Sequence, residues 1–292
     1  MIKNYVGKLR RLASRVKRGL LQGSALPPPV ASPATPSIPS VQTVDFICNV
    51  CGHHNIAVPL VNVQDREGQS CRQCRSSLRM RSVMYALSME LFGKALALPD
   101  FPVDREISGL GMSDWEGYSK GLEKKLAYTN TFYHTEPRLD ITNLSVKEIN
   151  KHRFLISSDV FEHIPILALD NAFRNSRLLL QDKGVFIFTV PFAKDGETRE
   201  HFPLMNEFRI IETKGKRYLY NQTIDGKEEI FDDLVFHGGD GMTLEMRMFS
   251  EPDLRRRLAT AGFSSIKVYT DCVPEFGILW PIDYAVPIAA RC

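Results

Sequence analysis

The sequence predicts an α/β fold, in which a doubly wound and mostly parallel sheet follows a small metal-binding module. Three observations support this prediction. The segment 154–192 has the pattern of a strand, a helix and a second strand. Before it, four cysteines form two Cys-X-X-Cys pairs, at 48–51 and 71–74. The segment 249–292 has the pattern of a helix followed by two strands.

The first 22 residues combine positive charge with apolar residues at roughly helical spacing. Residues 1–44 contain seven Lys or Arg and no acid. The whole chain carries +3, so the rest carries −4, which gives no support to nucleic-acid binding. A basic amphipathic helix at 1–22 can lie on an anionic membrane surface or bind an acidic partner. An organellar transit peptide or a frayed, solvated extension also fits the pattern.

A linker follows at 23–44, rich in proline, serine and alanine. Proline blocks helix interiors and sheet ladders, and this segment has little apolar surface to offset the entropy of chain ordering. We therefore expect a domain boundary here. The predicted organisation is a basic segment at 1–22, the linker, a zinc-ribbon-like module at 45–80 and a larger domain at 81–292.

The four cysteines of the module have the spacing of a metal site. Cys48 and Cys51 form one pair, and Cys71 and Cys74 follow after 19 residues. Each pair can turn two thiolates toward one point, so both together supply the tetrahedral four-sulfur site that Zn²⁺ favours. An iron–sulfur or redox site is the alternative. A closed site of this kind is structural, since it has no open position for water or substrate.

Four arginines surround the second cysteine pair: Arg72, Arg75, Arg79 and Arg81. We expect a solvated face that also neutralises the thiolates, and contact with a phosphate-rich ligand is the alternative. Apolar residues between 78 and 92 predict a helix that joins the module to the larger domain. Paired cysteines in a chain of 292 residues indicate a reducing compartment rather than a disulfide framework. The sequence thus predicts a cytoplasmic protein, with membrane contact through 1–22 as an option.

The segment 154–192 is the centre of the larger domain. An apolar run ends in a polar loop, a segment of helical period follows, and Gly184 precedes a second apolar run. A unit of roughly 35 residues with this pattern is a βαβ crossover, so its strands are parallel. Ligands of open parallel sheets bind beyond the carboxyl ends of the strands. Asp159, Glu162 and His163 fall at that edge, unless they only start a helix, where acids are favoured.

The chain ends in a helix and two strands. Ser250 has the position of a helix N-cap, and Gly262 that of a helix end. Strand-like segments follow at 265–269 and 287–291. A largely parallel sheet therefore acquires two further strands from the end of the chain.

These segments resemble a known enzyme family. The run Ser158-Asp159-Val160-Phe161-Glu162-His163-Ile164, the leucines at 178–180 and Gly184-Val185-Phe186-Ile187-Phe188 look like the central signature of class I S-adenosylmethionine-dependent methyltransferases, of the methyltransferase type 11 kind. The resemblance covers residues 104–292. It implies a Rossmann-like sheet with a C-terminal antiparallel hairpin, and S-adenosylmethionine as the cofactor.

The resemblance also implies where the cofactor binds. The first strand of the family ends in a glycine-rich turn, because a side chain there would collide with the methionine part of the cofactor. Gly109 and Gly111 match this turn and Asp114 follows, although Ser113 stands where a third glycine is expected. Asp159 and Glu162 are expected to complete this side of the site.

The second strand, at 128–134, departs from the family. Members usually end this strand in an acid that binds the ribose hydroxyls, and none follows directly here. Glu136 is the nearest acid, and Asn130 or Thr131 can take over the role. Asp140 matches the position that faces the adenine amine, where an acceptor is needed opposite an N–H₂ donor. A simple Asp turn is the alternative.

The expected function is methyl transfer by an enzyme with a structural zinc module. Transfer from a sulfonium requires in-line alignment of nucleophile, methyl group and sulfur, away from water. His163 and His201 are the expected general bases, since imidazole accepts a proton near neutral pH. By analogy of fold, the acceptor is a small molecule such as a sugar or lipid, while the module leaves RNA or protein substrates open. The sequence does not indicate an oligomeric state.

Two other functions compete with this one. A catalytically degenerate domain that recruits a partner through the zinc module is favoured by the missing third glycine and the missing ribose acid. A nucleotide-using oxidoreductase is disfavoured, because no Gly-X-Gly-X-X-Gly follows the first strand.

Overall fold

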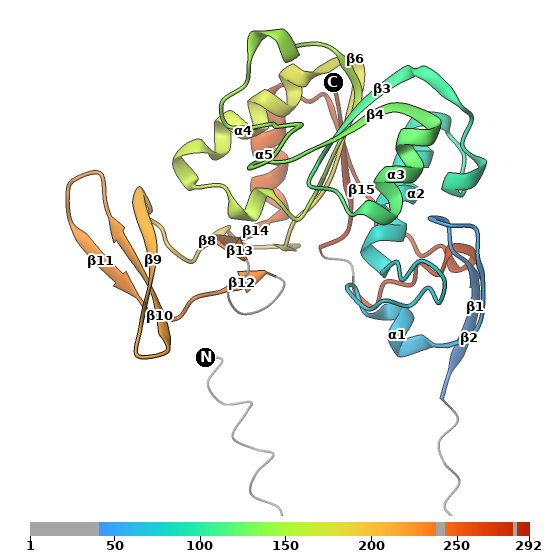
Figure 1. Ribbon diagram of the computed structural model, residues 1–292, viewed down its shortest axis with the longest axis horizontal. Helices are drawn as coiled ribbons and strands as arrows, with labels where there is room; N and C mark the ends of the chain where they lie inside the picture. Colours follow the sequence, from blue (N-terminus) through green and yellow to red (C-terminus); the bar gives the residue numbers. More distant parts are fainter. Residues whose placement is uncertain (1–40, 238–242, 283–284) are drawn as a thin grey trace, which may run out of the picture. The chain divides into compact units, whose positions relative to one another are not determined.

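The computed structural model describes residues 41–237, 243–282 and 285–292 (Figure 1). The predicted basic segment at 1–22 and the linker up to residue 40 lie outside them. Among the helices of these described ranges, none has the length and apolar character that a membrane span requires.

Six strands form the central sheet, in the order β15-β16-β6-β5-β3-β4. Their bounds are β3 Asp104–Met112, β4 Leu126–Thr131, β5 His152–Ser158, β6 Leu180–Thr189, β15 Ser265–Val268 and β16 Ile288–Arg291. Strands β3 to β6 run parallel, and β16 is antiparallel to both β6 and β15. The predicted parallel crossover and the antiparallel C-terminal strands are confirmed.

The order of the strands reverses between β3 and β5. From β3 the chain moves outward to β4, then returns to the other side of β3 to form β5 and β6. β3 and β5 are direct neighbours, with Gly109 opposite Phe154 and Met112 opposite Ser157. Such a switch point opens a crevice beyond the carboxyl ends of the two strands.

Helices cover both faces of the sheet (Figure 1). Their bounds are α2 Leu78–Phe92, α3 Glu116–Lys125, α4 Ile166–Leu179 and α5 Glu251–Ala261. Phe154 and Ile156 of β5 share a core with Met84 of α2 and Leu122 of α3, whereas Leu155 shares one with helices α4 and α5. Successive strand residues point to opposite faces, so an uninterrupted apolar run fits a strand that is buried on both sides.

The cysteine module packs on the same core as the sheet. It consists of the antiparallel strands β1 (Thr43–Ile47) and β2 (His54–Pro59), followed by the short helix α1 (Leu60–Gln64). Phe46 and Val58 belong to the hydrophobic cluster that contains Phe154. Residues 41–292 accordingly form one compact unit. Residue 80, where the sequence predicted the end of the module, lies inside α2.

An insertion of small sheets separates β6 from α5. Strands β9 (Glu207–Thr213), β10 (Lys216–Gln222) and β11 (Glu228–Phe231) form an antiparallel sheet. Short strands flank it: β7 Phe192–Ala193, β8 Arg199–Glu200, β12 Phe236–His237, β13 Thr243–Leu244 and β14 Arg247–Ser250. Because β14 pairs with both β7 and β8, the insertion begins and ends near the carboxyl end of β6.

Two helix predictions have different outcomes. The C-terminal helix is confirmed, since the Ser250 side chain accepts the N–H of Asp253 and Gly262 ends α5 in the left-handed conformation. The interpretation of the central acids as the start of a helix is wrong for α4. Glu162 lies in a separate 3₁₀ turn, Phe161–His163, and α4 begins only at Ile166, after Pro165.

Candidate functional site

The carboxyl ends of β3, β4 and β5 meet at one edge of the sheet. Met112 at the end of β3 lies opposite Thr131 of β4 and Ser157 of β5. Gly111 and Asp159 belong to this edge, whereas Gly109 lies inside β3. A Cβ atom on Gly109 would come within 2.2 Å of the Phe154 ring, so the glycine there permits core packing.

Asp114 follows β3 and is buried. Tyr118 donates a hydrogen bond of 2.8 Å to its Oδ1, and Tyr128 donates one of 2.6 Å to its Oδ2. Burial raises the pKa of Asp114 to about 6, although both tyrosine hydrogen bonds act in the opposite direction. Gly111 makes this cluster possible, because a Cβ atom on it would lie 1.9 Å from the Tyr128 hydroxyl.

Asn130 and Thr131 hold the end of β4 against β3. Asn130 bonds the backbone of Asp114 on both sides, accepting from its N–H at 2.9 Å and donating to its carbonyl at 2.8 Å. The Thr131 hydroxyl donates to the carbonyl of Gly111 at 2.7 Å. Asp140 lies in the loop beyond, where its Oδ1 accepts from the N–H and the hydroxyl of Thr142. These polar groups therefore make hydrogen bonds within the protein.

Asp159 lies directly after β5 and binds two arginines of the cysteine module. Arg66 donates from Nη1 and Nη2 to the two carboxylate oxygens, at 2.9 and 2.8 Å. Arg79 Nε lies 3.1 Å from Oδ2, and the Asp159 side chain is only 5% exposed. Thr189 at the end of β6 donates to Oδ1 at 2.7 Å. Asp159 has a positive φ of 54°, a conformation that costs a non-glycine residue some free energy and that these contacts maintain.

Arg66 was not singled out from the sequence. Arg79 was expected on a solvated face, with contact to a phosphate-rich ligand as the alternative, but its side chain is only 14% exposed, and Arg81 is fully buried. A signal exists for Arg79, because Ser82, Val83 and Ala86 share its side of α2 and all are buried. Arg66 lies in a loop and has no comparable signal.

Glu162 and His163 face the insertion. His163 Nδ1 lies 2.8 Å from the carbonyl of Leu244, so this nitrogen carries the proton and Nε2 is the basic one. Glu162 is buried, with Oε1 3.7 Å from His163 Nε2. Its carbonyl accepts the N–H of Met246 at 2.9 Å. The pair therefore contacts the segment that leads into β14.

His201 directly follows β8 and approaches the same segment. Its Nε2 lies 3.2 Å from Glu245 Oε1, and its N–H donates to the carbonyl of Met246. The buried Arg247 donates to Glu200 at 2.7 Å and to the carbonyl of Phe161 at 3.0 Å. Both predicted general bases thus lie along residues 244–247, beside the carboxyl end of β6.

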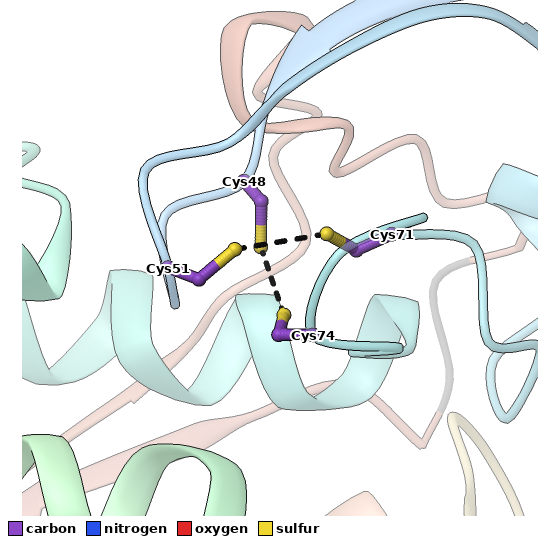
Figure 2. Close-up of side chains that lie close together, drawn as sticks. All are labelled: Cys48, Cys51, Cys71 and Cys74. Atoms are coloured by element: carbon purple, nitrogen blue, oxygen red, sulfur yellow. Dashed lines mark hydrogen bonds between the residues drawn. The ribbon is translucent and has the colours of Figure 1, made fainter.

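The four thiols of the module converge on one point (Figure 2). Their sulfurs all lie within 4.8 Å of one another. The Cys48–Cys74 and Cys51–Cys71 distances are 3.6 and 3.8 Å, too long for disulfides. A tetrahedral zinc with bonds of about 2.3 Å separates its sulfurs by about 3.8 Å, so the four residues fit this ion.

Polar neighbours support the thiol cluster. The Ser76 hydroxyl lies 3.1 Å from Cys48 Sγ, and Asn55 donates to Cys71 Sγ at 3.6 Å. Arg81 is buried beside the cluster, where it donates to the carbonyls of Ser76 and Gly277. A buried cation here would offset the negative charge of four thiolates around a bound metal ion.

Comparison with known proteins gives similarity of fold only. No family model matches the chain, and no curated protein matches it in sequence. A 1,6-didemethyltoxoflavin-N1-methyltransferase from Burkholderia thailandensis resembles it with 14% identity over 73% of this chain and 77% of that chain, at a TM-score of 0.41. An S-adenosylmethionine-dependent methyltransferase from Clostridium acetobutylicum has 15% identity over 63% of this chain and 82% of that chain, at a TM-score of 0.37. The glycopeptide N-methyltransferase MtfA has 12% identity over 67% of this chain and 89% of that chain, at a TM-score of 0.38. At these values the strand order of the sheet itself carries the fold assignment.

Proposed function

We propose that this chain is an S-adenosylmethionine-dependent methyltransferase, with its cofactor site at the carboxyl edge of β3, β4 and β5. One observation carries the proposal: the strand order reverses between β3 and β5, and polar groups follow both strands. In this proposal Gly109, Gly111, Asp114, Thr131, Asp140, Asp159 and Glu162 form or support the cofactor site.

Methyl transfer requires little from the protein's side chains beyond alignment of the reactants. A sulfonium is already an activated leaving group, so the protein has to orient the acceptor in line with the methyl group and exclude water. The insertion follows β6 and is the proposed acceptor side. His163 is the first candidate for a general base, since its Nδ1–H is held by the Leu244 carbonyl and its basic nitrogen is Nε2. His201 is the second.

We propose zinc as the ion of the four-cysteine site. When bound, it would link the two Cys-X-X-Cys turns and would supply no reactive position, because four thiolates complete its coordination. The module would thereby fix the loop that carries Arg66. We also propose that the methyl acceptor is a small molecule and that the protein is cytoplasmic. Residues 1–22 are the proposed contact with a membrane or an acidic partner.

A second candidate function has its own support. The carboxylates of Asp114 and Asp159 are both bound by protein donors, as a degenerate methyltransferase domain that only binds a partner would allow. A transfer assay separates the two. Incubation with S-adenosylmethionine labelled in the methyl group and with a small-molecule extract should give a labelled product. Binding of S-adenosylhomocysteine without any labelled product would favour the second function.

A further inference from the structure

Arg66 and Arg79 form a paired cationic site at the sheet edge. Arg66 precedes the second cysteine pair and Arg79 follows it, and the N–H of Arg79 donates to the carbonyl of Arg66 at 3.1 Å. Arg66 Nε also donates to the carbonyl of Ala285 at 3.0 Å, which ties the pair to the segment before β16. Metal-bound cysteines between them would keep the two guanidinium groups together.

The pair lies beyond the end of β5, where Arg66 and Arg79 both contact Asp159. Arg79 donates to the hydroxyl of Ser158, the last residue of β5. Its charge also acts on Asp114 beyond β3, where it opposes the rise in pKa that burial causes. The guanidinium of Arg79 therefore contacts the end of β5 and also acts electrostatically on the carboxyl group that follows β3.

Two carboxylates balance the two cations, and they differ in character. Asp159 is almost fully buried and fixed by four donor groups. Glu67 is 47% exposed, and its oxygens lie 2.6 Å from Arg79 Nη2 and 2.8 Å from Arg79 Nε. Glu67 also pairs with Arg66.

Glu67 is the more exposed of the two carboxylates. Burial works to raise its pKa, but the hydrogen bond and charge of Arg79 and the charge of Arg66 outweigh burial and lower the pKa. Its carboxylate therefore spans both guanidinium groups as an anion, on a solvent-exposed loop. A ligand carboxylate in its place would keep the charges balanced and the same donors satisfied.

We propose that Arg66 and Arg79 form the subsite that binds the α-carboxylate of the cofactor's amino-acid group, a carboxylate that replaces Glu67. This inference rests on the proposed function, since it assigns one end of the same ligand. It makes the cysteine module part of the cofactor site.

Calorimetric titration of the zinc-loaded full chain tests the subsite with two probes. S-Adenosylhomocysteine carries the amino-acid carboxylate, and 5′-methylthioadenosine lacks it. Glu67→Gln removes the competing charge. It should therefore raise the affinity for S-adenosylhomocysteine roughly three- to tenfold and leave the affinity for 5′-methylthioadenosine unchanged. Because binding becomes tighter, a folding defect cannot produce this result.

Arg66→Lys and Arg79→Lys should act in the opposite direction. Each substitution keeps the charge but loses bidentate donation. The affinity for S-adenosylhomocysteine should therefore fall about tenfold, while the affinity for 5′-methylthioadenosine should change less than about twofold. Arg72→Lys is the matched control, because Arg72 belongs to the same module and is exposed. The subsite is overturned if Glu67→Gln leaves S-adenosylhomocysteine affinity unchanged or lowers it, or if both probes respond equally. If the unchanged chain binds neither probe, the proposed function itself fails and the subsite fails with it.

Discussion

The carboxylate of Asp159 lies 2.8 Å from the guanidinium of Arg66, a residue 93 positions earlier in the chain. This contact joins the cysteine module to the end of β5. With Arg79 on the same carboxylate, it links the two parts of the chain that the sequence suggested were separate domains. The stability of the edge and the binding of a ligand there should therefore depend on the module.

Asp159→Asn should destabilise the protein, because it leaves two mostly buried guanidinium groups facing an amide. We expect the free energy of unfolding to fall by about 2–4 kcal/mol, somewhat less than for a fully buried pair because Arg66 is partly exposed. Urea unfolding followed by circular dichroism measures it. Asp170→Asn is the control, since Asp170 pairs with Arg257 but is 70% exposed. Equal effects of the two substitutions would contradict the role given to Asp159.

Removal of metal should unfold the module and weaken the sheet edge. The expected loss in free energy of unfolding is roughly 5 kcal/mol or more, since metal binding and folding are coupled. Elemental analysis should find one zinc ion per chain, and a chelator titration with thermal melting measures the loss. Cys71→Ser should abolish binding, while Cys272→Ser, at an exposed cysteine, should not. A chain without zinc that melts at the same temperature would refute the assignment.

Asp114 should impose a pH dependence on stability. Its pKa rises from 3.8 to about 6 in the folded protein, so the native state holds this proton more tightly than the unfolded chain. Its contribution is therefore greatest at low pH and is lost as the pH rises from about 4 to about 6. The free energy of unfolding should therefore fall by on the order of 3 kcal/mol across that range, and Asp114→Asn should abolish this fall.

The measurement compares the two proteins at each pH. Glu67 and Asp253 have lowered pKa values, so their contributions are lost as the pH falls, opposite to that of Asp114. Subtracting the variant's free energy of unfolding from that of the unchanged protein at each pH removes these other contributions. A difference that stays constant from pH 4 to pH 7 would show that Asp114 does not titrate as described.

Gly111→Ala should destabilise the end of β3, because its Cβ atom would lie 1.9 Å from the Tyr128 hydroxyl and 2.3 Å from Asp114 Oδ2. The expected cost is about 1–3 kcal/mol, as for other overpacked cores. In a Tyr128→Phe background the closest contact is gone, so the same substitution should cost less. Thermal unfolding of all four proteins measures this coupling, and full additivity would argue against the contact.

The strands were predictable from the sequence because their burial pattern is simple. β5 and β6 are apolar at successive positions, as strands covered on both faces must be, and Gly262 and Ser250 mark the ends of α5. The cysteine cluster was predictable from its spacing alone. These features depend on residues close together in the chain.

The partners of the polar site residues were not predictable in the same way. Asp159 was expected at the sheet edge, but nothing near Arg66 in the sequence indicates that it would bind there. His163 bonds to a carbonyl of the insertion, whose path a local pattern does not specify. Asp114 is bound by tyrosines of α3 and β4, which the packing of two elements brings together.

The most direct test of the proposed cofactor site is calorimetric titration of the zinc-loaded full chain with S-adenosylhomocysteine. We predict saturable binding at one site per chain. No saturable binding up to millimolar ligand would contradict this prediction.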